Sequence, residues 1–278
     1  MSRLTIAIPT FRRPQDLKRA VSGVLEQAGE LVGGSSAEAR EPEGDAAGAV
    51  DVDGGTGRGV SDVEVLVIDN DAQGTGREAA LAAAADAGVP VRSSAEGSEE
   101  PEAVDLRYVV EEKPGVAAVR NRALDETGGR DLLVFIDDDE EPEPGWLAAL
   151  VGLWASTGCQ AVAGPVIPVY EVEPEEWVRQ GEFFVRRTWP TGTVRPVAAS
   201  NCLLLDLGFV RRAGLRFDEA FGATGGEDTL FTRRLSAAGG VIRWCDEARV
   251  RDHVPASRLT RPWILRRQRS HAATSVRV

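Results

Sequence analysis

Three adjacent aspartates, Asp137, Asp138 and Asp139, directly follow the apolar run Leu132–Ile136. A short run of branched and aromatic residues is typical of a strand that is buried on both faces. Carboxylates crowded at its end repel one another unless a cation or hydrogen-bond donors compensate. Because side chains alternate along an extended chain, Asp137 and Asp139 could reach one hard divalent cation, Mg²⁺ or Mn²⁺. The alternative is a solvated turn that caps the helix starting near Pro144.

A second acidic pair, Glu227 and Asp228, follows two glycines, Gly225 and Gly226. The glycines allow a tight turn, and the acids fall in the first turn of a helix that we expect over residues 228–238. Negative charge is favourable at that position because of the helix dipole, which is a purely structural interpretation. The aromatic and glycine-rich segment before the pair, FDEAFGATGG, favours instead the wall of a site.

Alternating strands and helices must position these acids. We expect strands at 3–9, 63–69, 106–110 and 131–136, separated by helices at 14–27, 77–87 and 115–127. This order predicts an α/β fold with a mostly parallel sheet and right-handed crossovers. Open sheets of this kind bind ligands at the carboxyl ends of their strands, where the three aspartates lie.

The second half of the chain is expected to add a helix, further strands and a loop-built pocket. The helix is expected at 146–157, strands at 159–169, 199–206 and 239–248, a short helix at 207–214, an irregular pocket-forming loop at 171–197 and an edge segment at 249–254 that completes the sheet. The whole chain is long enough to form one large domain of this class.

The negative charge is concentrated in two segments without periodicity. Residues 29–62 carry eight acids, two arginines and nine glycines, and residues 93–105 carry five acids and no base, whereas the whole chain has a net charge of −12. Both segments are expected to be flexible insertions. Residues 249–278 carry eight arginines and one acid, so the bulk charge misdescribes individual surfaces.

Composition excludes several other classes of protein. An acidic chain is not expected to bind nucleic acid. The three cysteines are widely spaced and form no C-x-x-C pair, which favours a reducing cytosol and argues against zinc; they are Cys159, Cys202 and Cys245. No apolar run is long enough to span a membrane, and no signal peptide is recognisable. We therefore expect a cytoplasmic protein.

Five segments resemble, in the same order, the motifs of family-2 glycosyltransferases with the GT-A fold. They are IPTFRRP at 8–14, VLVIDND at 65–71, GVAAVRNRAL at 115–124, FIDDDEEPEPGWL at 135–147 and GGEDTLFTRRL at 225–235. The first, second and fourth are most similar to the bacterial exopolysaccharide branch, the succinoglycan-type glucosyltransferases. The resemblance implies one GT-A domain with a Rossmann-like nucleotide half over about 1–140, an α/β acceptor half over about 141–256 and a basic tail at 257–278.

The resemblance also implies the parts of the donor site. The nucleotide would be held by residues from three motifs, which are Pro9, Thr10, Phe11, Arg12, Asp69, Arg120 and Asn121. Asp69 would accept a hydrogen bond from the base, while Arg120 and Asn121 approach the ribose and diphosphate. In the family's D-x-D position, Asp138 would lie near the ribose, Asp139 on the metal and Asp137 in support of it.

By the same resemblance, Asp228 is the catalytic base and Glu227 positions the acceptor. His253 stands where related enzymes sometimes place a further metal or diphosphate ligand; the alternative is a histidine whose bonds are satisfied at the sheet edge. The implied reaction is an inverting, metal-assisted transfer of a sugar from a nucleotide sugar, with UDP-sugars favoured, to a saccharide or lipid-linked acceptor in surface polysaccharide synthesis.

General chemistry agrees with these roles. A sugar leaves a diphosphate only if the charge that develops on the phosphate is stabilised, which a divalent metal held by carboxylates can do. The acceptor hydroxyl is a poor nucleophile, so a carboxylate must take its proton. Two alternatives stay open: a sugar nucleotidylyltransferase, although PTFRRP is not its glycine-rich loop, and a non-catalytic nucleotide-sugar binding protein.

The basic tail allows two interpretations. Leu259, Trp263 and Ile264 fall near one face of a helix, and Pro262 marks its start or a kink. The helix could dock Trp263 on the body and leave its arginines solvated. It could instead anchor the protein peripherally to anionic lipid at the inner face of the cell membrane.

Overall fold

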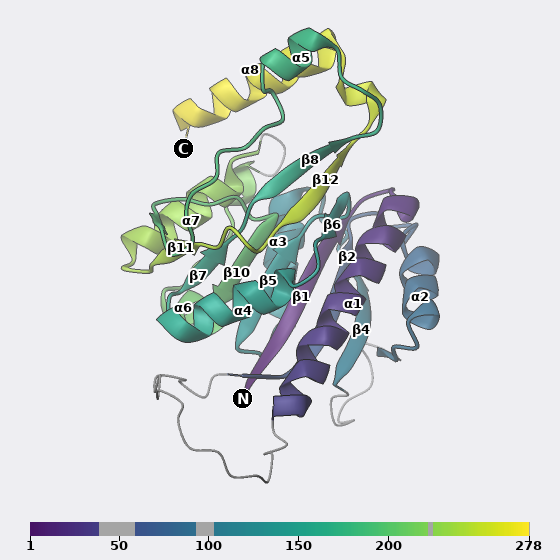
Figure 1. Cartoon of the computed structure of the whole chain (residues 1–278), viewed down its shortest axis with the longest axis vertical. Coiled ribbons are helices and arrows are strands. Elements are labelled where there is room, and N and C mark those ends of the chain that lie inside the picture. Colours follow the sequence, from purple (N-terminus) through teal and green to yellow (C-terminus); the bar gives the residue numbers. More distant parts are fainter. Residues whose placement is uncertain (39–58, 93–102, 222–224, 278) are drawn as a thin grey trace, which may run out of the picture.

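The computed structural model describes residues 1–38, 59–92, 103–221 and 225–277. Within these residues the chain forms a large mixed sheet covered by helices on both faces, a smaller sheet, and a C-terminal helix that lies across one end (Figure 1). The predicted α/β class is confirmed, and the residues 39–58 and 93–102, which make up most of the two predicted insertions, lie outside the described part.

The large sheet has nine strands in the order β3-β4-β2-β1-β5-β10-β7-β11-β9. Their bounds are β1 Ser2–Thr10, β2 Val60–Asp69, β3 Val91–Arg92, β4 Val104–Val110, β5 Leu132–Ile136, β7 Ala161–Ala163, β9 Val194–Arg195, β10 Cys202–Asp206 and β11 Ile242–Trp244. Strands β4, β2, β1 and β5 are parallel, whereas β10 pairs antiparallel with β5. The carboxyl ends of the parallel strands therefore meet at one edge, as predicted.

Helices cover both faces of this sheet (Figure 1). On one face, α1 (Pro14–Glu38), α2 (Arg77–Asp86) and α4 (Trp146–Thr157) pack their apolar residues on alternate side chains of β1, β2 and β5. On the other, α3 (Val116–Glu126), α6 (Leu207–Arg212) and α7 (Glu227–Ala237) pack on the intervening side chains. Burial of both faces explains why Leu132–Ile136 is apolar throughout.

A smaller sheet of three strands lies beside the end of the large one. It has the order β6-β12-β8, with β6 Glu140–Pro142, β8 Val166–Tyr170 and β12 Val250–Val254. The short helix α5 Glu176–Gln180 and the longer C-terminal helix α8 Arg261–Arg277 lie side by side beyond it (Figure 1). They are joined by a cluster of apolar residues that includes Val178, Leu259 and Ile264.

Three sequence predictions need correction. Helix α1 continues to Glu38 and β2 begins at Val60, so the first insertion is shorter than 29–62; likewise Asp105 lies in β4 and is buried. The expected strand 159–169 is two strands in different sheets, because the chain turns at Gly164, where a Cβ would stand 2.0 Å from the Ala248 carbonyl oxygen.

The third correction concerns residues 249–254. They do not extend the large sheet: β12 is the central strand of the small sheet, antiparallel to β6 and parallel to β8. Since β6 follows directly on the three aspartates, this pairing ties the C-terminal part of the chain to the acidic segment. The amide of His253 donates to the Asp139 carbonyl oxygen at 3.2 Å.

Candidate active site

A cavity of about 1370 Å³ opens at the carboxyl ends of β1 and β5. Both halves of the chain contribute to it. Seven carboxylates and six arginines line it: Asp137, Asp138, Asp139, Glu140, Glu227, Asp228 and Asp252, with Arg13, Arg120, Arg186, Arg233, Arg258 and Arg267. The two acidic motifs of the sequence, about 90 residues apart along the chain, are therefore brought to one cavity.

The end of β1 holds the middle aspartate. The hydroxyl of Thr10 donates to Asp138 Oδ2 at 2.7 Å, and Arg13 donates to Oδ1 at 3.1 Å. Burial nevertheless raises the pKa of Asp138 to about 6, since the neighbouring aspartates add to the effect. A further cation or hydrogen-bond donor near Asp138 would therefore stabilise its ionised form and lower its pKa.

Two arginines from distant parts of the chain hold Asp139. Arg13 and Arg258 both donate to its Oδ2 atom, at 3.0 and 2.9 Å. Partial burial raises the pKa of the neighbouring Asp137, an effect that Arg120 opposes and Asp139 and Asp228 strengthen. The ionised form of Asp137 would thus be stabilised by any additional positive charge that binds near this loop.

These carboxylates fit a divalent cation that also binds a second molecule. Carboxylate oxygen is the ligand type that Mg²⁺ and Mn²⁺ prefer. Among the described residues, however, no three His, Cys, Asp or Glu side chains are arranged to hold a metal ion by themselves. Asp137 and Asp139 would therefore supply part of the coordination, and phosphate oxygens of a ligand would have to supply the rest.

Hydrogen bonds behind the aspartates fix the shape of the loop. Glu140 accepts from the Asp137 amide at 3.1 Å and from the side chain of Asn201. Burial raises the pKa of Glu140 well above its usual value. Asn201 in turn accepts from Arg186 at 3.0 Å, so the acidic loop, the segment before β10 and the loop after α5 are connected.

The two acids of the second motif, Glu227 and Asp228, have different surroundings. Gly226, at φ 95°, makes the turn that starts α7 and places both acids at the cavity. Glu227 is buried and forms an ion pair with Arg120, which also lies 3.6 Å from Asp137. Burial raises the pKa of Glu227, and its Oε2 atom accepts no hydrogen bond from the described residues.

Asp228 faces the cavity with one oxygen held. Its Oδ1 accepts from the amide of Thr229 at 2.6 Å and from the Thr229 hydroxyl at 3.3 Å. Hydrogen bonds to one oxygen fix the orientation of a carboxylate and leave the other for a ligand. This geometry suits an acceptor of a proton from a bound hydroxyl group.

The expected nucleotide residues divide into two groups. Pro9, Thr10, Phe11, Arg120 and Asp138 line the cavity. The remaining three, Arg12, Asp69 and Asn121, do not line it.

Each of these three has a structural partner instead. Asp69 is fully buried and accepts from Tyr108 and from the amides of Asp71 and Gly76. Arg12 pairs with Asp71 at 3.2 Å. Asn121 exchanges two hydrogen bonds of 2.9 Å with the Phe217 backbone. A direct contact of Asp69 with a base thus has no support from the geometry.

Arg13 and Asn70 line the cavity in place of their chain neighbours Arg12 and Asp69. Asn70 donates to the carbonyl oxygens of Glu111 and Lys113 and accepts from the Gly115 amide, so it fixes the loop before α3. The sequence carried a signal for both, because each belongs to a motif that was recognised.

His253 is bonded through its backbone to Asp139, but it does not line the cavity. Its Nε2 atom lies 3.0 Å from Glu141 Oε2. This is the position expected of a histidine whose bonds are satisfied in the sheet. A role as a metal ligand stays a prediction without support from the geometry.

Sequence reasoning missed several polar residues of the cavity that come from the second half of the chain. Those from loops or from the tail include Arg186, Asn201, Arg258 and Arg267. Each comes from a loop or from the tail, where no periodic pattern predicts direction. The excess of arginine after residue 249 was the one signal that pointed to them.

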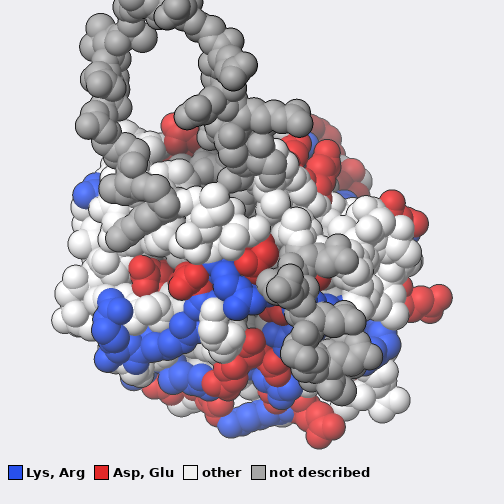
Figure 2. Space-filling model, turned by 90° about the horizontal axis from the view of Figure 1, so that it is seen from below, with Lys and Arg blue, Asp and Glu red and all other residues white. Residues whose placement is uncertain are grey.

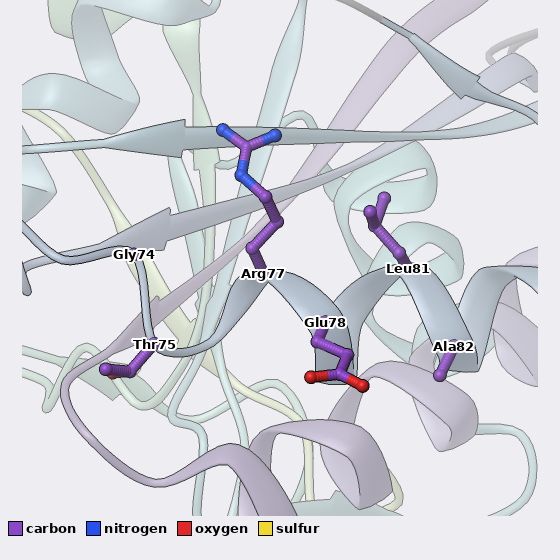
Figure 3. A pocket seen from close by; sticks show the side chains of 6 residues that line it. All are labelled: Gly74, Thr75, Arg77, Glu78, Leu81 and Ala82. Carbon is purple, nitrogen blue, oxygen red and sulfur yellow. The ribbon is translucent and has the colours of Figure 1, made fainter.

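A second, shallower pocket of about 640 Å³ lies at the start of α2 (Figure 3). Its lining is Gly74, Thr75, Arg77, Glu78, Leu81 and Ala82. The guanidinium of Arg77 lies 4.6 Å from the centre of the Tyr108 ring, and Glu78 points away from Arg77 in Figure 3. No group of acids converges there among the described residues, so the chemistry is concentrated in the larger cavity.

Comparison with known proteins found a matching family and a similar curated protein. The family described as Glycosyl transferase family 2 matches residues 59–212. The succinoglycan biosynthesis protein ExoM of Rhizobium meliloti (strain 1021) is 33% identical over 212 residues, which are 74% of this chain and 62% of that protein. The chain thus matches less than two thirds of the length of this relative.

Solved structures with the same fold include those of two proteins, S. aureus TarS and GalNAc-T7. S. aureus TarS 1-349 matches with a TM-score of 0.59 and 13% identity over 90% of this chain and 60% of that chain. TarS 1-349 in complex with UDP-GlcNAc has a TM-score of 0.57, 13% identity and coverage of 91% and 58%. GalNAc-T7 with UDP, GalNAc and Mn²⁺ has a TM-score of 0.59, 13% identity and coverage of 91% and 44%.

Proposed function

Because the chain belongs to glycosyl transferase family 2 and has the GT-A fold, we propose that it transfers a sugar from a nucleoside diphosphate sugar to a hydroxyl group of a saccharide or lipid-linked acceptor, with inversion. The observation that carries this proposal is the meeting of Asp137–Asp139 and Asp228 in one cavity. Membership of the family replaces the nucleotidylyltransferase and non-catalytic interpretations.

The donor would enter from the side of the parallel strands. Phe11 and Asn70 line that side, with Thr10 and Arg13 holding Asp138 near the expected ribose. Mg²⁺ or Mn²⁺ held by Asp139 and Asp137 would neutralise the charge that develops on the diphosphate as the sugar leaves. A uridine nucleotide is favoured because TarS has been solved in complex with UDP and with UDP-GlcNAc, and GalNAc-T7 with UDP.

The acceptor would enter from the opposite side. The hydroxyl that attacks the sugar must lose its proton, and Asp228 has an oxygen facing the cavity that can take it. Glu227, held by Arg120, keeps one buried oxygen without a hydrogen bond from the described residues and would orient the acceptor. One base and one displacement give inversion at the sugar carbon.

Synthesis of an exopolysaccharide is the proposed setting, supported by the likeness to ExoM. A lipid-linked acceptor would lie at a membrane, and no described helix is long and apolar enough to cross one. Helix α8 presents Leu265, Arg266 and Arg269 outward, whereas Ile264 is buried and Trp263 stacks on Phe184 with centres 5.8 Å apart. The tail is therefore docked on the body, and we propose that its outer face contacts anionic lipid at the inner face of the cytoplasmic membrane.

The function is tested first by donor binding. We expect UDP to bind in the presence of Mn²⁺, as measured by titration calorimetry across a panel of nucleoside diphosphates, and binding to fall with excess chelator. Transfer from the matching nucleotide sugar should then give a product of inverted anomeric configuration by NMR. Absence of binding by every nucleoside diphosphate would refute the proposal.

Lipid contact is tested by co-sedimentation with vesicles. Replacing Arg266 and Arg269 with glutamine should reduce binding to vesicles of phosphatidylglycerol at low salt, since each basic residue near an anionic surface contributes about 1 kcal/mol. The matched control is Arg212→Gln, on helix α6. Equal binding of both variants would leave the tail as a docked helix only.

A further inference from the structure

Two exposed apolar side chains lie at the edge of the large cavity, on the loop after α5. Phe183 is 38% exposed and Val185 is 56% exposed, and both line the cavity. Phe11, which is also exposed and lines the cavity, lies instead on the side of the parallel strands. An exposed apolar surface that adjoins a cavity often marks a place where a ligand binds.

The backbone before Phe183 holds its ring in this exposed place. Glu182 has φ 47°, a left-handed conformation that residues other than glycine rarely adopt. The ring lies over Gly181, where a Cβ would overlap it, and its centre is 5.8 Å from that of Trp177. Such unfavourable backbone is concentrated at functional sites, where the surrounding structure maintains it. The turn therefore presents the ring at the cavity instead of burying it.

Aromatic packing behind the loop keeps it in position. Phe184, between the two exposed residues, stacks on Trp263 of α8 with centres 5.8 Å apart. Tyr170 meets the same ring edge-on at 5.9 Å, and the apolar cluster with Val178 lies around them. The apolar edge is thus set before any ligand binds, which reduces the entropy lost on binding.

The charges beside the loop determine which apolar partner fits. Glu175, Glu176 and Glu182 are all exposed next to Phe183 in the chain. They would be repelled by the negative surface of an anionic bilayer, so the lipid contact proposed for α8 does not extend over this loop. A single hydrocarbon chain carries no charge and is not repelled.

The cavity determines the remainder of the bound molecule. Asp137 and Asp228 line the same cavity as Phe183 and Val185, so a molecule that covers the apolar edge continues into a polar space. It must therefore have an apolar part and a polar part. A nucleoside diphosphate sugar has no hydrocarbon chain. Of the two substrates in the proposed reaction, only the acceptor can carry one.

We propose that Phe183 and Val185 bind the hydrocarbon chain of a lipid-linked acceptor whose polar end enters the cavity. The two residues thereby select an acceptor with such a chain over a soluble saccharide. Contact with them removes the chain from water, and each buried CH₂ group strengthens binding by about fourfold. This inference rests on the proposed function, because it specifies the acceptor of the same reaction.

Farnesyl phosphate and inorganic phosphate, compared in the presence of chelator, are the probes for this apolar edge, because they differ in the hydrocarbon chain. Titration calorimetry should show that the unchanged protein binds farnesyl phosphate more tightly, by about tenfold or more. Val185→Ser should weaken binding of farnesyl phosphate about fivefold, since the chain loses contact with the methyl groups, and leave binding of inorganic phosphate unchanged.

Val194→Ser is the matched control for Val185→Ser. Val194 is 57% exposed, lies on β9 and does not line the cavity. This variant should bind farnesyl phosphate as the unchanged protein does. Equal affinity of the two serine variants for farnesyl phosphate would overturn the proposal.

Substitution of Phe183 distinguishes a hydrocarbon chain from a sugar ring that stacks on the aromatic face. Phe183→Leu keeps an apolar side chain and should retain the affinity for farnesyl phosphate to within about twofold, whereas Phe183→Ser should lose about tenfold. Stacking on a ring requires the aromatic face. If the leucine and serine variants lost affinity equally, the ring itself would be recognised and a hydrocarbon chain would be the wrong occupant.

Binding of UDP with Mn²⁺ separates this inference from the proposed function. All four variants should bind UDP as tightly as the unchanged protein. Loss of UDP affinity in Val185→Ser, in parallel with that for farnesyl phosphate, would place the apolar edge in the donor site and contradict the inference. If UDP bound but farnesyl phosphate bound no better than inorganic phosphate, the inference would fail and the proposed function would stand. If farnesyl phosphate bound but no nucleoside diphosphate did, the proposed function would fail and the apolar edge would remain a binding site for the chain.

Discussion

The acidic side chains at the two ends of the parallel strands have different surroundings. At the amino ends of the strands, Asp62 pairs with Arg130, and Glu64 accepts from Arg107, which also pairs with Glu126. Figure 2 shows the molecule from this side, with basic and acidic side chains adjoining on the surface. At the carboxyl ends, Asp137, Asp138 and Asp139 are adjacent, and burial raises the pKa of the first two.

This difference separates structure from function. Acids paired with arginines stabilise the connection between neighbouring elements and need no further partner. Carboxylates crowded at a cavity cost stability, and such crowding persists where a ligand or reaction uses it. The comparison predicts that substitutions at one end reduce activity and those at the other reduce stability.

The largest effect is expected at Asp139. Asp139→Ala should reduce transfer to an undetectable level, because the position that would hold the metal and the diphosphate is lost. The temperature of unfolding should change little, because Arg13 and Arg258 lose a partner while repulsion among the adjacent aspartates is relieved. Transfer assays and thermal unfolding measure the two; full activity in excess chelator would contradict the assignment.

Asp228→Asn tests the proposed base. It keeps the shape and the bond to the Thr229 amide but cannot accept a proton, so transfer should fall by roughly 10² or more with donor affinity unchanged. Single-turnover experiments measure the rate of transfer, and titration with UDP measures the affinity for the donor nucleotide. Loss of donor affinity with turnover kept would place Asp228 in the nucleotide site.

Asp62→Asn tests the opposite end. Arg130 is 5% exposed and would lose its main partner, although Glu64 stays 3.8 Å away, so the free energy of unfolding should fall by about 2 kcal/mol. The folded variant should transfer sugar at the unchanged rate. If the transfer rate dropped strongly at a temperature where the variant is folded, the prediction that this end of the sheet affects stability alone would be wrong.

Asp105, near the amino end of β4, should make the free energy of unfolding depend on pH. It is fully buried, lies 3.2 Å from Arg92, and burial raises its pKa to about 6. Because the folded state holds this proton more tightly than the unfolded state, stability should fall as pH rises from about 4 to about 6. Asp105→Asn should flatten this part of the profile of unfolding free energy against pH; an unchanged slope would show that Asp105 is ionised throughout.

The smallest effect is expected for the first acidic insertion. Replacing residues 39–58 with a glycine–serine segment of equal length should change the free energy of unfolding by less than about 0.5 kcal/mol, since the sequence there has few large apolar residues to bury. Donor affinity should also be unchanged. The replacement stops at these bounds because α1 continues to Glu38 and β2 begins at Val60.

The sequence determined the parts of the molecule that depend on local pattern. The apolar run Leu132–Ile136 and the acids after it specified a buried strand with a charged end, and α4 forms over the residues 146–157 that its pattern predicts. The order of elements then placed Asp137–Asp139 at the binding edge of the sheet. These features follow from neighbours in sequence, which periodicity and turn residues record.

Only the tertiary structure decided which arginines face the acids. The backbone at Arg12 has φ 55°, which turns Arg12 to Asp71 and Arg13 to Asp138 and Asp139. Arg258 meets Asp139 across 119 residues because β12 pairs with β6, a contact between strands that no local pattern encodes. Long side chains from loops and the tail take their direction from packing, and packing depends on residues that the sequence places far apart.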